Sequence, residues 1–179
     1  MRFENTSVYN IYNAILGARN PMNSWSKSDS IFNGFNGKIE NTVIGKNDLE
    51  LMQKLIKAGS EHRKFLRQIF VAVDITAPLF WWKEFDTYKV GTAANSTSTM
   101  HKLASTPITI DCFEMDDFED FDLEAEDFNF PLKAIWAELT SDLELCRKKY
   151  NATKDKRYWK ELIRLLPESW LQKRTITMN

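Results

Sequence analysis

The sequence predicts a single domain, residues 1–179, of the α/β (α+β) class that is mostly helical and has a small sheet. A chain of 179 residues is long enough to bury one core. Its 13% of aromatic residues, with only 6 Gly and 5 Pro, exclude a disordered, collagenous or low-complexity chain. Apolar residues recur at helical spacing in several segments, and a strand-like segment follows them near the C-terminal end.

The first half of the chain contains two predicted helices. Asn47 or Asp48 can cap a helix that runs from Leu49, and Gly59-Ser60 is the expected break before a second helix. The apolar residues at helical spacing are Leu51, Met52, Leu55, Ile56, Phe65, Leu66, Ile69 and Phe70. Upstream, residues 8–16 are an apolar element of ambiguous type. Residues 17–30 are a polar stretch, either a ligand-lining loop or an ordinary surface loop.

An aromatic segment follows an apolar run that Pro78 interrupts. Adjacent tryptophans are more often part of a core or an interface than a cofactor platform. Four aromatic residues in six positions are more than one side of a small core readily absorbs. The sequence therefore predicts a homo-oligomer, with these residues at or beside the subunit contact: Phe80, Trp81, Trp82 and Phe85.

The last third of the chain predicts two helices and a strand. From Pro131 onward one helical face carries Leu132, Ile135, Trp136, Leu139, Leu143 and Cys146. Asp155 can start another helix that ends near Pro167, with Trp159, Leu162, Ile163 and Leu166 facing inward. Residues 174–178 read as a terminal strand.

Several classes of protein are excluded. No run of 18 apolar residues exists, so a membrane-spanning helix is not expected. The first residues contain no apolar region typical of a secretory signal, so we expect a cytoplasmic protein, in a bacterial host. Cys112 and Cys146 are expected to be reduced thiols. His62 and His101 have no second ligand at metal-binding spacing, so no metal site is expected.

The net charge of −1 hides an uneven distribution. Ten acids and no base lie between Asp111 and Asp127, whereas the rest of the chain has 24 bases against 15 acids. Residues 111–130, which we call the acidic segment, also contain five phenylalanines and are expected to be an insertion or loop that partly folds or docks. The basic body could attract phosphate, and the acidic segment could attract a basic partner. The alternative is a solvated loop with phenylalanines in the core.

Common enzyme signatures are absent: there is no G-x-S-x-G, P-loop, G-x-G-x-x-G or H-E-x-x-H motif. The remaining pattern combines residues 92–98, residues 163–167 and residues 175–179. Together these blocks resemble the flavin-dependent thymidylate synthases, whose signature R-H-R-x-x-S-x-N-E-x-S-x-R-Y precedes a block A-R-x-x-L-P and a strand ending in T-x-N-x-R. The matched residues are Asn95, Ser98, Arg164, Leu166-Pro167, Thr177 and Asn179, with Glu61-His62 similar to an upstream E-H pair.

The resemblance implies a homotetramer that binds FAD and dUMP at subunit interfaces and makes dTMP with reduced flavin and a folate-borne methylene. It assigns Ser98, Arg164 and Lys89 to the nucleotide, and His62, Asn95 and Asn179 to the flavin. Residues 19–25 and 81–101 look more closely like phage and Firmicute relatives of that family, which suggests a divergent relative.

The departures from the family pattern argue against turnover. Tyr88-Lys89-Val90 stand where R-H-R is expected, and Ser96 replaces the glutamate of the motif. The sequence also ends at Asn179, before the arginines and the final helix that follow in the family, and is expected to be truncated. Loss of one transition-state charge contact typically lowers the rate by about two or more powers of ten.

Two functions follow from these observations. The favoured one is a non-catalytic, phage-borne or mobile-element relative in which any FAD has been lost. It would bind a basic or nucleic-acid-binding host protein, such as a defence protein, and inhibit it. The partner-binding residues would be Asp116, Asp117, Glu119, Asp120, Phe118 and Phe121. The alternative is conversion of dUMP to dTMP with FAD, NADPH and methylenetetrahydrofolate.

Overall fold

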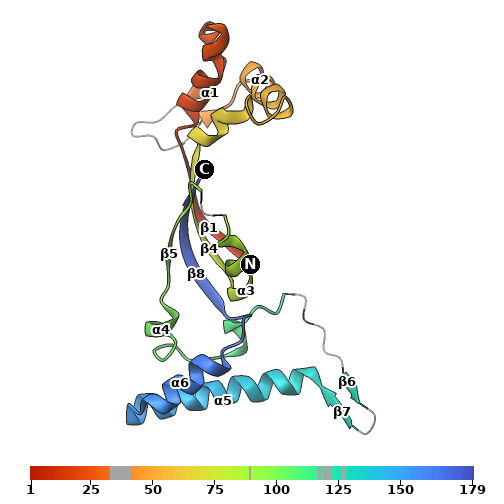
Figure 1. The fold of residues 1–179 in the computed structure, drawn as a ribbon, viewed down its shortest axis with the longest axis vertical. Coiled ribbons are helices and arrows are strands. Elements are labelled where there is room, and N and C mark those ends of the chain that lie inside the picture. The colour runs from red at the N-terminus through yellow and green to blue at the C-terminus, as the bar shows by residue number, and fades with distance from the viewer. Residues whose placement is uncertain (33–41, 89, 117, 119–121, 126–127) are drawn as a thin grey trace. The chain divides into compact units, whose positions relative to one another are not determined.

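The computed structural model describes residues 1–32, 42–88, 90–116, 118, 122–125 and 128–179 (Figure 1). The chain divides into two compact units. Unit 1 contains Met1–Arg2, Ile75–Tyr88 and Asn95–Arg174, and unit 2 contains Phe3–Asp74, Lys89–Ala94 and Thr175–Asn179. The predicted extent of the domain, residues 1–179, stays a prediction.

A four-stranded antiparallel sheet has the strand order β1-β4-β8-β5. The strands are β1 (Arg2–Tyr9), β4 (Phe70–Pro78), β8 (Leu171–Met178) and β5 (Ala93–Ser96). Strand β4 is the apolar run of the sequence, and its second half, from Ile75 to Pro78, is buried. The predicted α/β class is confirmed, and so is the C-terminal strand, which begins three residues earlier than expected.

Unit 2 packs its helices around Ala14, Ile15, Met52 and Phe65. Its elements are α1 (Ile11–Arg19), 3₁₀ turns at Asn20–Met22 and Trp25–Lys27, β2 (Ile31–Phe32), β3 (Thr42–Val43), α2 (Lys46–Lys57) and a 3₁₀ segment at Arg63–Gln68. The ambiguous segment 8–16 divides at Asn10, whose φ of 64° ends β1 and precedes α1. The break at Gly59 is confirmed, but the second predicted helix is a 3₁₀ segment.

The predicted cap of α2 is wrong. The helix begins at Lys46 after Gly45, so Asn47 and Asp48 lie inside its first turn. The side chain of Asp29 supplies the capping acceptor, because its carboxylate accepts the backbone N–H groups of Asn47 and Asp48 at 2.9 and 3.1 Å. The backbone N–H groups of the first helical turn have no acceptor within the helix, and in α2 the carboxylate of Asp29 accepts two of them.

Unit 1 contains the remaining helices and a short hairpin. These are α3 (Leu79–Phe85), α4 (Thr99–Lys102), a 3₁₀ turn at Ile110–Cys112, β6 (Asp122–Ala125), β7 (Phe128–Pro131), α5 (Leu132–Thr153) and α6 (Lys156–Leu165). Helix α5 places Trp136, Leu139, Leu143 and Cys146 in a core with Leu103, Ile108, Phe113 and Leu162, as its periodicity predicts. Ile135, predicted on the same face, is exposed instead. Asp155 caps α6 by accepting the N–H of Arg157 at 2.9 Å.

The aromatic residues of α3 have unequal environments. Trp82 is 1% exposed and donates its indole N–H to the Gln172 carbonyl at 3.0 Å, so it belongs to the core. Trp81 stacks on Phe85, with ring centroids 5.1 Å apart. Phe80, in contrast, is half exposed. The predicted homo-oligomer stays a prediction, and within α3 Phe80 is the ring best placed to contact a second subunit.

Glu144 links α5 to residues 104–108, which follow α4. Its carboxylate accepts the Ile108 backbone N–H at 2.9 Å and two N–H groups of Arg147 at 2.6 and 2.7 Å. Arg147 in turn reaches the Ala104 carbonyl at 3.3 Å. The hydrogen bonds from Arg147 are the main reason why the pKa of Glu144 falls to about 2.

We expect Glu144→Gln to lower the free energy of unfolding at pH 7 by about 2 kcal/mol, because a charge-assisted hydrogen bond contributes about that much. A lowered pKa stabilises the fold above the unfolded value, near 4.5, and this contribution disappears as the pH falls toward 2. Urea denaturation between pH 7 and pH 2 should therefore show a flatter profile for the variant. An unchanged slope between pH 4.5 and 2 would contradict this role.

Candidate functional site

The residues that the resemblance assigns to the nucleotide have structural partners. The Ser98 hydroxyl caps α4 by accepting the His101 N–H at 3.2 Å. Arg164 lies in the last turn of α6, is 65% exposed, and pairs with Glu161 at 2.5 Å. No hydrogen bond or ion pair joins Ser98 to Arg164 in the described part of the chain. Lys89 lies outside the described residues.

The residues that the resemblance assigns to the flavin are exposed. His62 precedes the 3₁₀ segment Arg63–Gln68, and Asn95 lies in β5. The Asn179 amide donates to the Arg67 carbonyl at 3.3 Å. The same amide fills the space beside Gly91, whose φ is 68° and where an added Cβ would lie 2.5 Å from the Asn179 side-chain oxygen. Asn179 therefore has a packing role at the end of β8.

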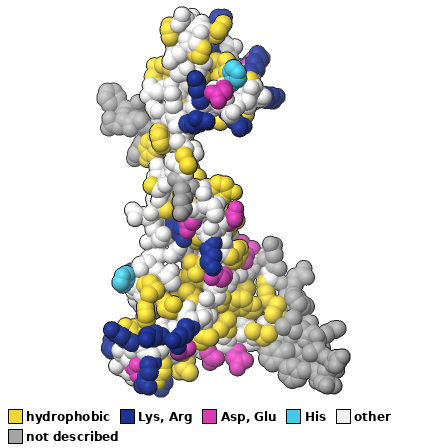
Figure 2. Space-filling view, in the orientation of Figure 1, with side chains coloured by type: hydrophobic (Ala, Val, Ile, Leu, Met, Phe, Trp, Pro, Cys, Tyr) yellow, Lys and Arg dark blue, Asp and Glu magenta, His cyan; other side chains and the backbone are white. Residues whose placement is uncertain are grey.

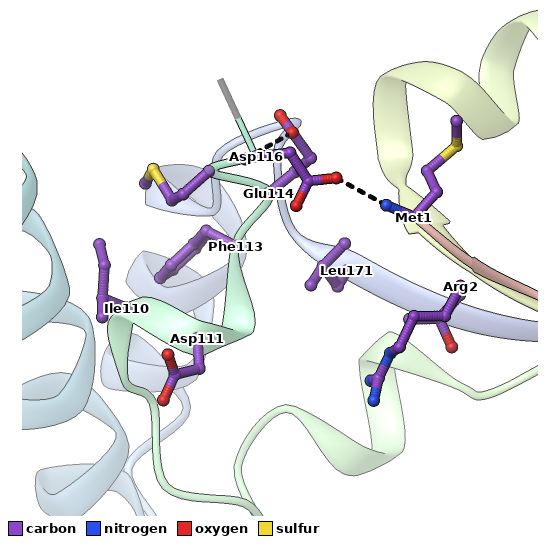
Figure 3. A pocket seen from close by; sticks show the side chains of 10 residues that line it. Met1, Arg2, Ile110, Asp111, Phe113, Glu114, Asp116 and Leu171 are labelled. Carbon is purple, nitrogen blue, oxygen red and sulfur yellow. Dashed lines mark hydrogen bonds and ion pairs between the residues drawn. The ribbon is translucent and has the colours of Figure 1, made fainter. Parts of the chain in front are cut away.

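A cavity of about 480 Å³ opens at the start of the acidic segment in unit 1 (Figure 3). Its polar rim contains the carboxylates of Asp111, Glu114 and Asp116 and the guanidinium of Arg2. Its apolar lining comes from Met1, Ile110, Phe113, Met115 and Leu171, and Thr76 completes the wall. Three carboxylates face two cations, the Arg2 guanidinium and the Met1 amino group, which is paired with Asp116. The remaining surplus of negative charge, above an apolar wall, favours a ligand with a positive charge and an aliphatic stem.

Phe113 fixes this part of the acidic segment to the core. Its ring is 3% exposed and lies between Trp136 and Trp170, with ring centroids 5.6 Å from each. Its backbone forms an isolated antiparallel bridge with Trp170, and the Glu114 N–H donates to the Ser169 carbonyl at 2.8 Å. The expectation that part of the acidic segment folds is met at Phe113.

The rest of the acidic segment is described in part. Asp116 is exposed, and its carboxylate lies 2.7 Å from the Met1 amino group. Phe118 is half-buried. Strands β6 and β7 pair in antiparallel register, from Asp122 opposite Pro131 to Ala125 opposite Phe128. The other predicted partner-binding residues, Asp117, Glu119, Asp120 and Phe121, lie outside the described residues.

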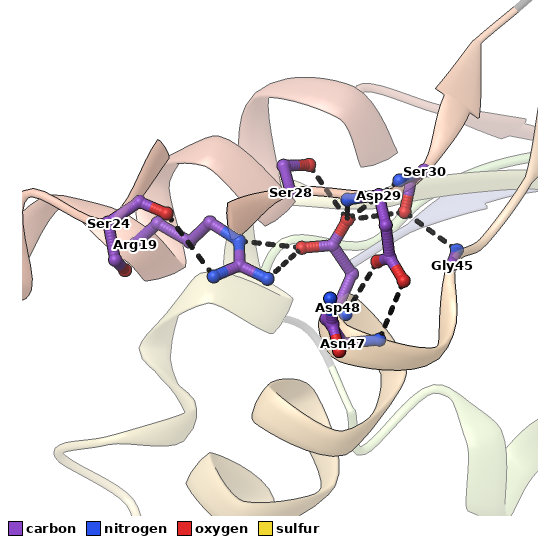
Figure 4. Close-up of polar contacts among 8 residues, drawn as sticks. All are labelled: Arg19, Ser24, Ser28, Asp29, Ser30, Gly45, Asn47 and Asp48. Carbon is purple, nitrogen blue, oxygen red and sulfur yellow. Dashed lines mark hydrogen bonds and ion pairs between the residues drawn. The ribbon is translucent and has the colours of Figure 1, made fainter. Parts of the chain in front are cut away.

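A buried ion pair orders the polar stretch of unit 2, and the sequence did not reveal it (Figure 4). Arg19, at the end of α1, donates from Nε to Asp48 Oδ1 at 2.6 Å, and both side chains are nearly inaccessible, at 4% and 0%. The other Asp48 oxygen accepts from the Ser28 and Ser30 hydroxyls and from the backbone N–H groups of Asp29 and Ser30. Burial raises the pKa of Asp48, but the hydrogen bonds from Ser30, Ser28 and Arg19 outweigh it and leave the pKa lowered.

A second cavity, of about 310 Å³, lies beside this ion pair. Its lining consists of Arg19, Lys27, Asn47, Glu50, Leu51 and Lys54. The polar stretch 17–30 therefore lines a cavity through Arg19 and Lys27. The only trace of the ion pair in the sequence is that Arg19 ends the apolar segment of α1 and that Asp48 lies in the first turn of α2.

The two cavities described above are not lined by the residues that the resemblance assigns to the flavin. None of His62, Asn95 and Asn179 lines either cavity, and the Asn179 amide is occupied by Arg67. Within the described ranges, no group of His, Cys, Asp or Glu side chains is arranged to hold a metal ion. Cys112 and Cys146 are free thiols, and burial raises the pKa of Cys146. Among the same residues, no helix is long and apolar enough to cross a bilayer.

Comparison with protein-family models and with curated proteins gives no match. Two structures of the flavin-dependent thymidylate synthase of Helicobacter pylori, each with FAD and dUMP, match 100% of this chain and 79% and 78% of theirs, with TM-scores of 0.64 and 0.63 and 14% identity. The UMP/dUMP methylase PolB of Streptomyces cacaoi, bound with 5-Br UMP, matches 99% of this chain and 71% of its own, with a TM-score of 0.53 and 14% identity. The chain therefore has the fold of the flavin-dependent thymidylate synthases.

Proposed function

We propose that this chain is a divergent, non-catalytic relative of the flavin-dependent thymidylate synthases that binds a basic protein through its acidic segment. The observation that carries the proposal is the attachment of that segment at Phe113, which is 3% exposed, while Asp111 and Asp116 beside it are exposed. Carboxylates held on a core lose less conformational freedom on binding than those of a free loop. The cavity at the same place suits the side chain of a lysine or arginine.

The proposed loss of turnover rests on the nucleotide positions. Tyr88 and Val90 replace two permanently charged residues of the family motif. The guanidinium of Arg164 is paired with Glu161, and the hydroxyl of Ser98 caps α4. A single arginine can bind a phosphate through two parallel hydrogen bonds, but Arg164 is paired with Glu161 and the two motif cations are replaced. We therefore expect dUMP to bind weakly, in the high micromolar range or above. We also propose that FAD binding has been lost.

The partner proposal is tested by a variant in which four acids are changed together to Asn or Gln: Asp116, Asp117, Glu119 and Asp120. This variant should lose partner binding and keep a nearly unchanged melting temperature. Charge supplies the affinity in this account, so raising the salt concentration should release the partner from the unmodified protein. The measurement is a pull-down from host lysate at low and high salt, with a parallel thermal melt.

The matched control changes four exposed acids elsewhere: Glu50, Glu61, Glu138 and Asp142. It alters the net charge of the chain by the same amount. The proposal expects the control to retain the partner. Equal recovery of every protein by the unmodified chain and both variants would remove the case for recognition by the acidic segment.

Flavin-dependent methylation of dUMP is the second candidate, because the solved structures that share the fold contain FAD and dUMP. A visible absorption spectrum of the purified protein separates the two. A flavin band near one per chain would favour the enzyme, whereas our proposal expects none.

A further inference from the structure

A strongly basic surface lies at the adjoining ends of α5 and α6. Between positions 147 and 164 the chain has eight bases and two acids, a surplus of six in a protein whose net charge is −1. We call these eight residues the basic surface: Arg147, Lys148, Lys149, Lys154, Lys156, Arg157, Lys160 and Arg164. Figure 2 shows dark blue side chains gathered over this end of the two helices.

The turn between the helices brings these charges together. Helix α5 ends at Thr153, Lys154 adopts a left-handed φ of 58°, and Asp155 caps α6. The two helices pack against each other, so the last turns of α5 and the first turns of α6 lie side by side (Figure 1). Charges contributed by both helices therefore occupy one end of the pair.

Half of these bases have no ion pair with a described residue, whereas Arg147 and Lys148 both contact Glu144, which precedes the counted positions. Lys149, Lys156 and Lys160 are exposed, and none has an ion pair with another described residue. The two acids, Asp155 and Glu161, pair with Arg157 and Arg164. The three unpaired lysines project into solvent, where they raise the local positive potential.

Three bases of α6 lie on one face of the helix, and only Arg164 among them has an acidic partner, Glu161. Lys156, Lys160 and Arg164 recur every four residues and share one face. Like charges at this spacing destabilise a helix, so an external anion is the simplest group that would stabilise the arrangement. From Lys156 to Arg164 the helix rises about 12 Å. That length spans three or four phosphates of one strand at about 3.4 Å each.

The apolar face of α6 is not available to a membrane. Leu162 is fully buried, and Ile163 and Leu166 pack against the same core. A basic amphipathic helix that binds lipid must expose its apolar face, and on α6 only Leu165 of the larger aliphatic residues is exposed. Instead, two half-buried aromatic residues lie among the lysines: Tyr158 on α6, and Tyr150, whose ring is 5.7 Å from the Lys154 ammonium. Tyrosines beside cations are typical of surfaces on which nucleobases stack.

We propose that the basic surface binds the phosphate backbone of a nucleic acid. This proposal is independent of the acidic segment and of the non-catalytic assignment. The probes are fluorescently labelled single-stranded and duplex DNA of equal length and mixed sequence, followed by anisotropy at several salt concentrations. The unmodified protein should bind with micromolar affinity, and its affinity should fall steeply as salt is added.

The test variant changes Lys149, Lys156 and Lys160 together to Gln. It should bind DNA about tenfold or more weakly at low salt, and the slope of log affinity against log salt concentration should fall in magnitude by about 3. The same three residues changed to Arg should retain binding, since the charge is preserved. The control changes Lys46, Lys54 and Lys57 of α2, all exposed, to Gln, and should alter the affinity less than about threefold.

Three results would overturn the proposal, provided that circular dichroism shows all variants folded. One is that the unmodified protein binds neither DNA. Another is that the α2 control weakens binding as much as the α5–α6 variant, which would make net charge the only cause. The third is that vesicles rich in phosphatidylserine bind the protein more tightly than either DNA.

Discussion

Replacing Asp48 with Asn lowers the free energy of unfolding by about 3–5 kcal/mol, because it leaves the buried charge of Arg19 without its partner. Arg19 is 4% exposed, so water cannot replace the carboxylate around most of its guanidinium. The variant also weakens the acceptor for the two hydroxyls and two backbone N–H groups of residues 28–30. Urea denaturation at pH 7 measures the loss.

Glu50→Gln is the matched control, since Glu50 lies on the same helix and is exposed. It should change the free energy of unfolding by no more than about 0.5 kcal/mol. Replacing Arg19 and Asp48 together with apolar residues should not restore full stability, because Ser28 and Ser30 would still lack an acceptor. A loss below about 1 kcal/mol for Asp48→Asn would mean that water reaches Arg19 in solution.

Phe113→Ala should be the second severe change, with a loss of about 3–5 kcal/mol. Its ring is 3% exposed between two tryptophan rings, so truncation leaves a cavity in the core of unit 1. Phe118 is half-buried, and Phe118→Ala should cost about 1–2 kcal/mol. The comparison locates where the acidic segment stops being part of the core and becomes available to a partner.

Phe80→Ala serves as the control for ring removal, because Phe80 is half exposed on α3. It should have a small effect on the free energy of unfolding of one chain. Equal losses for Phe113→Ala and Phe80→Ala in chemical denaturation would show that Phe113 does not hold the acidic segment on the core.

Local signals in the sequence were sufficient for the C-terminal helices. Asp155 accepts the N–H of Arg157, as an N-cap should, and the apolar residues that follow it at helical spacing are buried or half-buried. The same rules failed at Asp48, which is a good cap by residue type. Its partner, Arg19, is 29 positions away, and no local pattern reveals such a pair. Tertiary contacts overrode the capping preference.

The acidic segment and β1 show a different limit. Residues 111–130 were predicted as an insertion or loop that partly folds, and within them acidic residues have low strand propensity, yet Asp122–Ala125 pairs with Phe128–Pro131. Strand β1 is exposed along most of its length and therefore has no strong alternation of apolar residues. Pairing with neighbouring strands, which a single segment does not show, determines both elements.

The candidate nucleotide and flavin residues were located by their order in a family motif and not by a physical argument. The order of Asn95, Ser98 and Arg164 pointed to the flavin-dependent thymidylate synthases, and the fold confirms that resemblance. Their side-chain roles were not predictable, because Ser98 caps a four-residue helix and Arg164 pairs within its own helix. The motif thus located these residues, but their contacts followed only from the three-dimensional structure.

Tritium release from dUMP labelled at the pyrimidine C5 tests the central claim, a thymidylate synthase fold without turnover, most directly. The protein is incubated with FAD, NADPH and methylenetetrahydrofolate, and a flavin-dependent thymidylate synthase serves as the positive control. We expect no release above the protein-free background, since the permanent charges of the family motif are replaced at Tyr88 and Val90. Release that grows with protein concentration and requires FAD would contradict the claim.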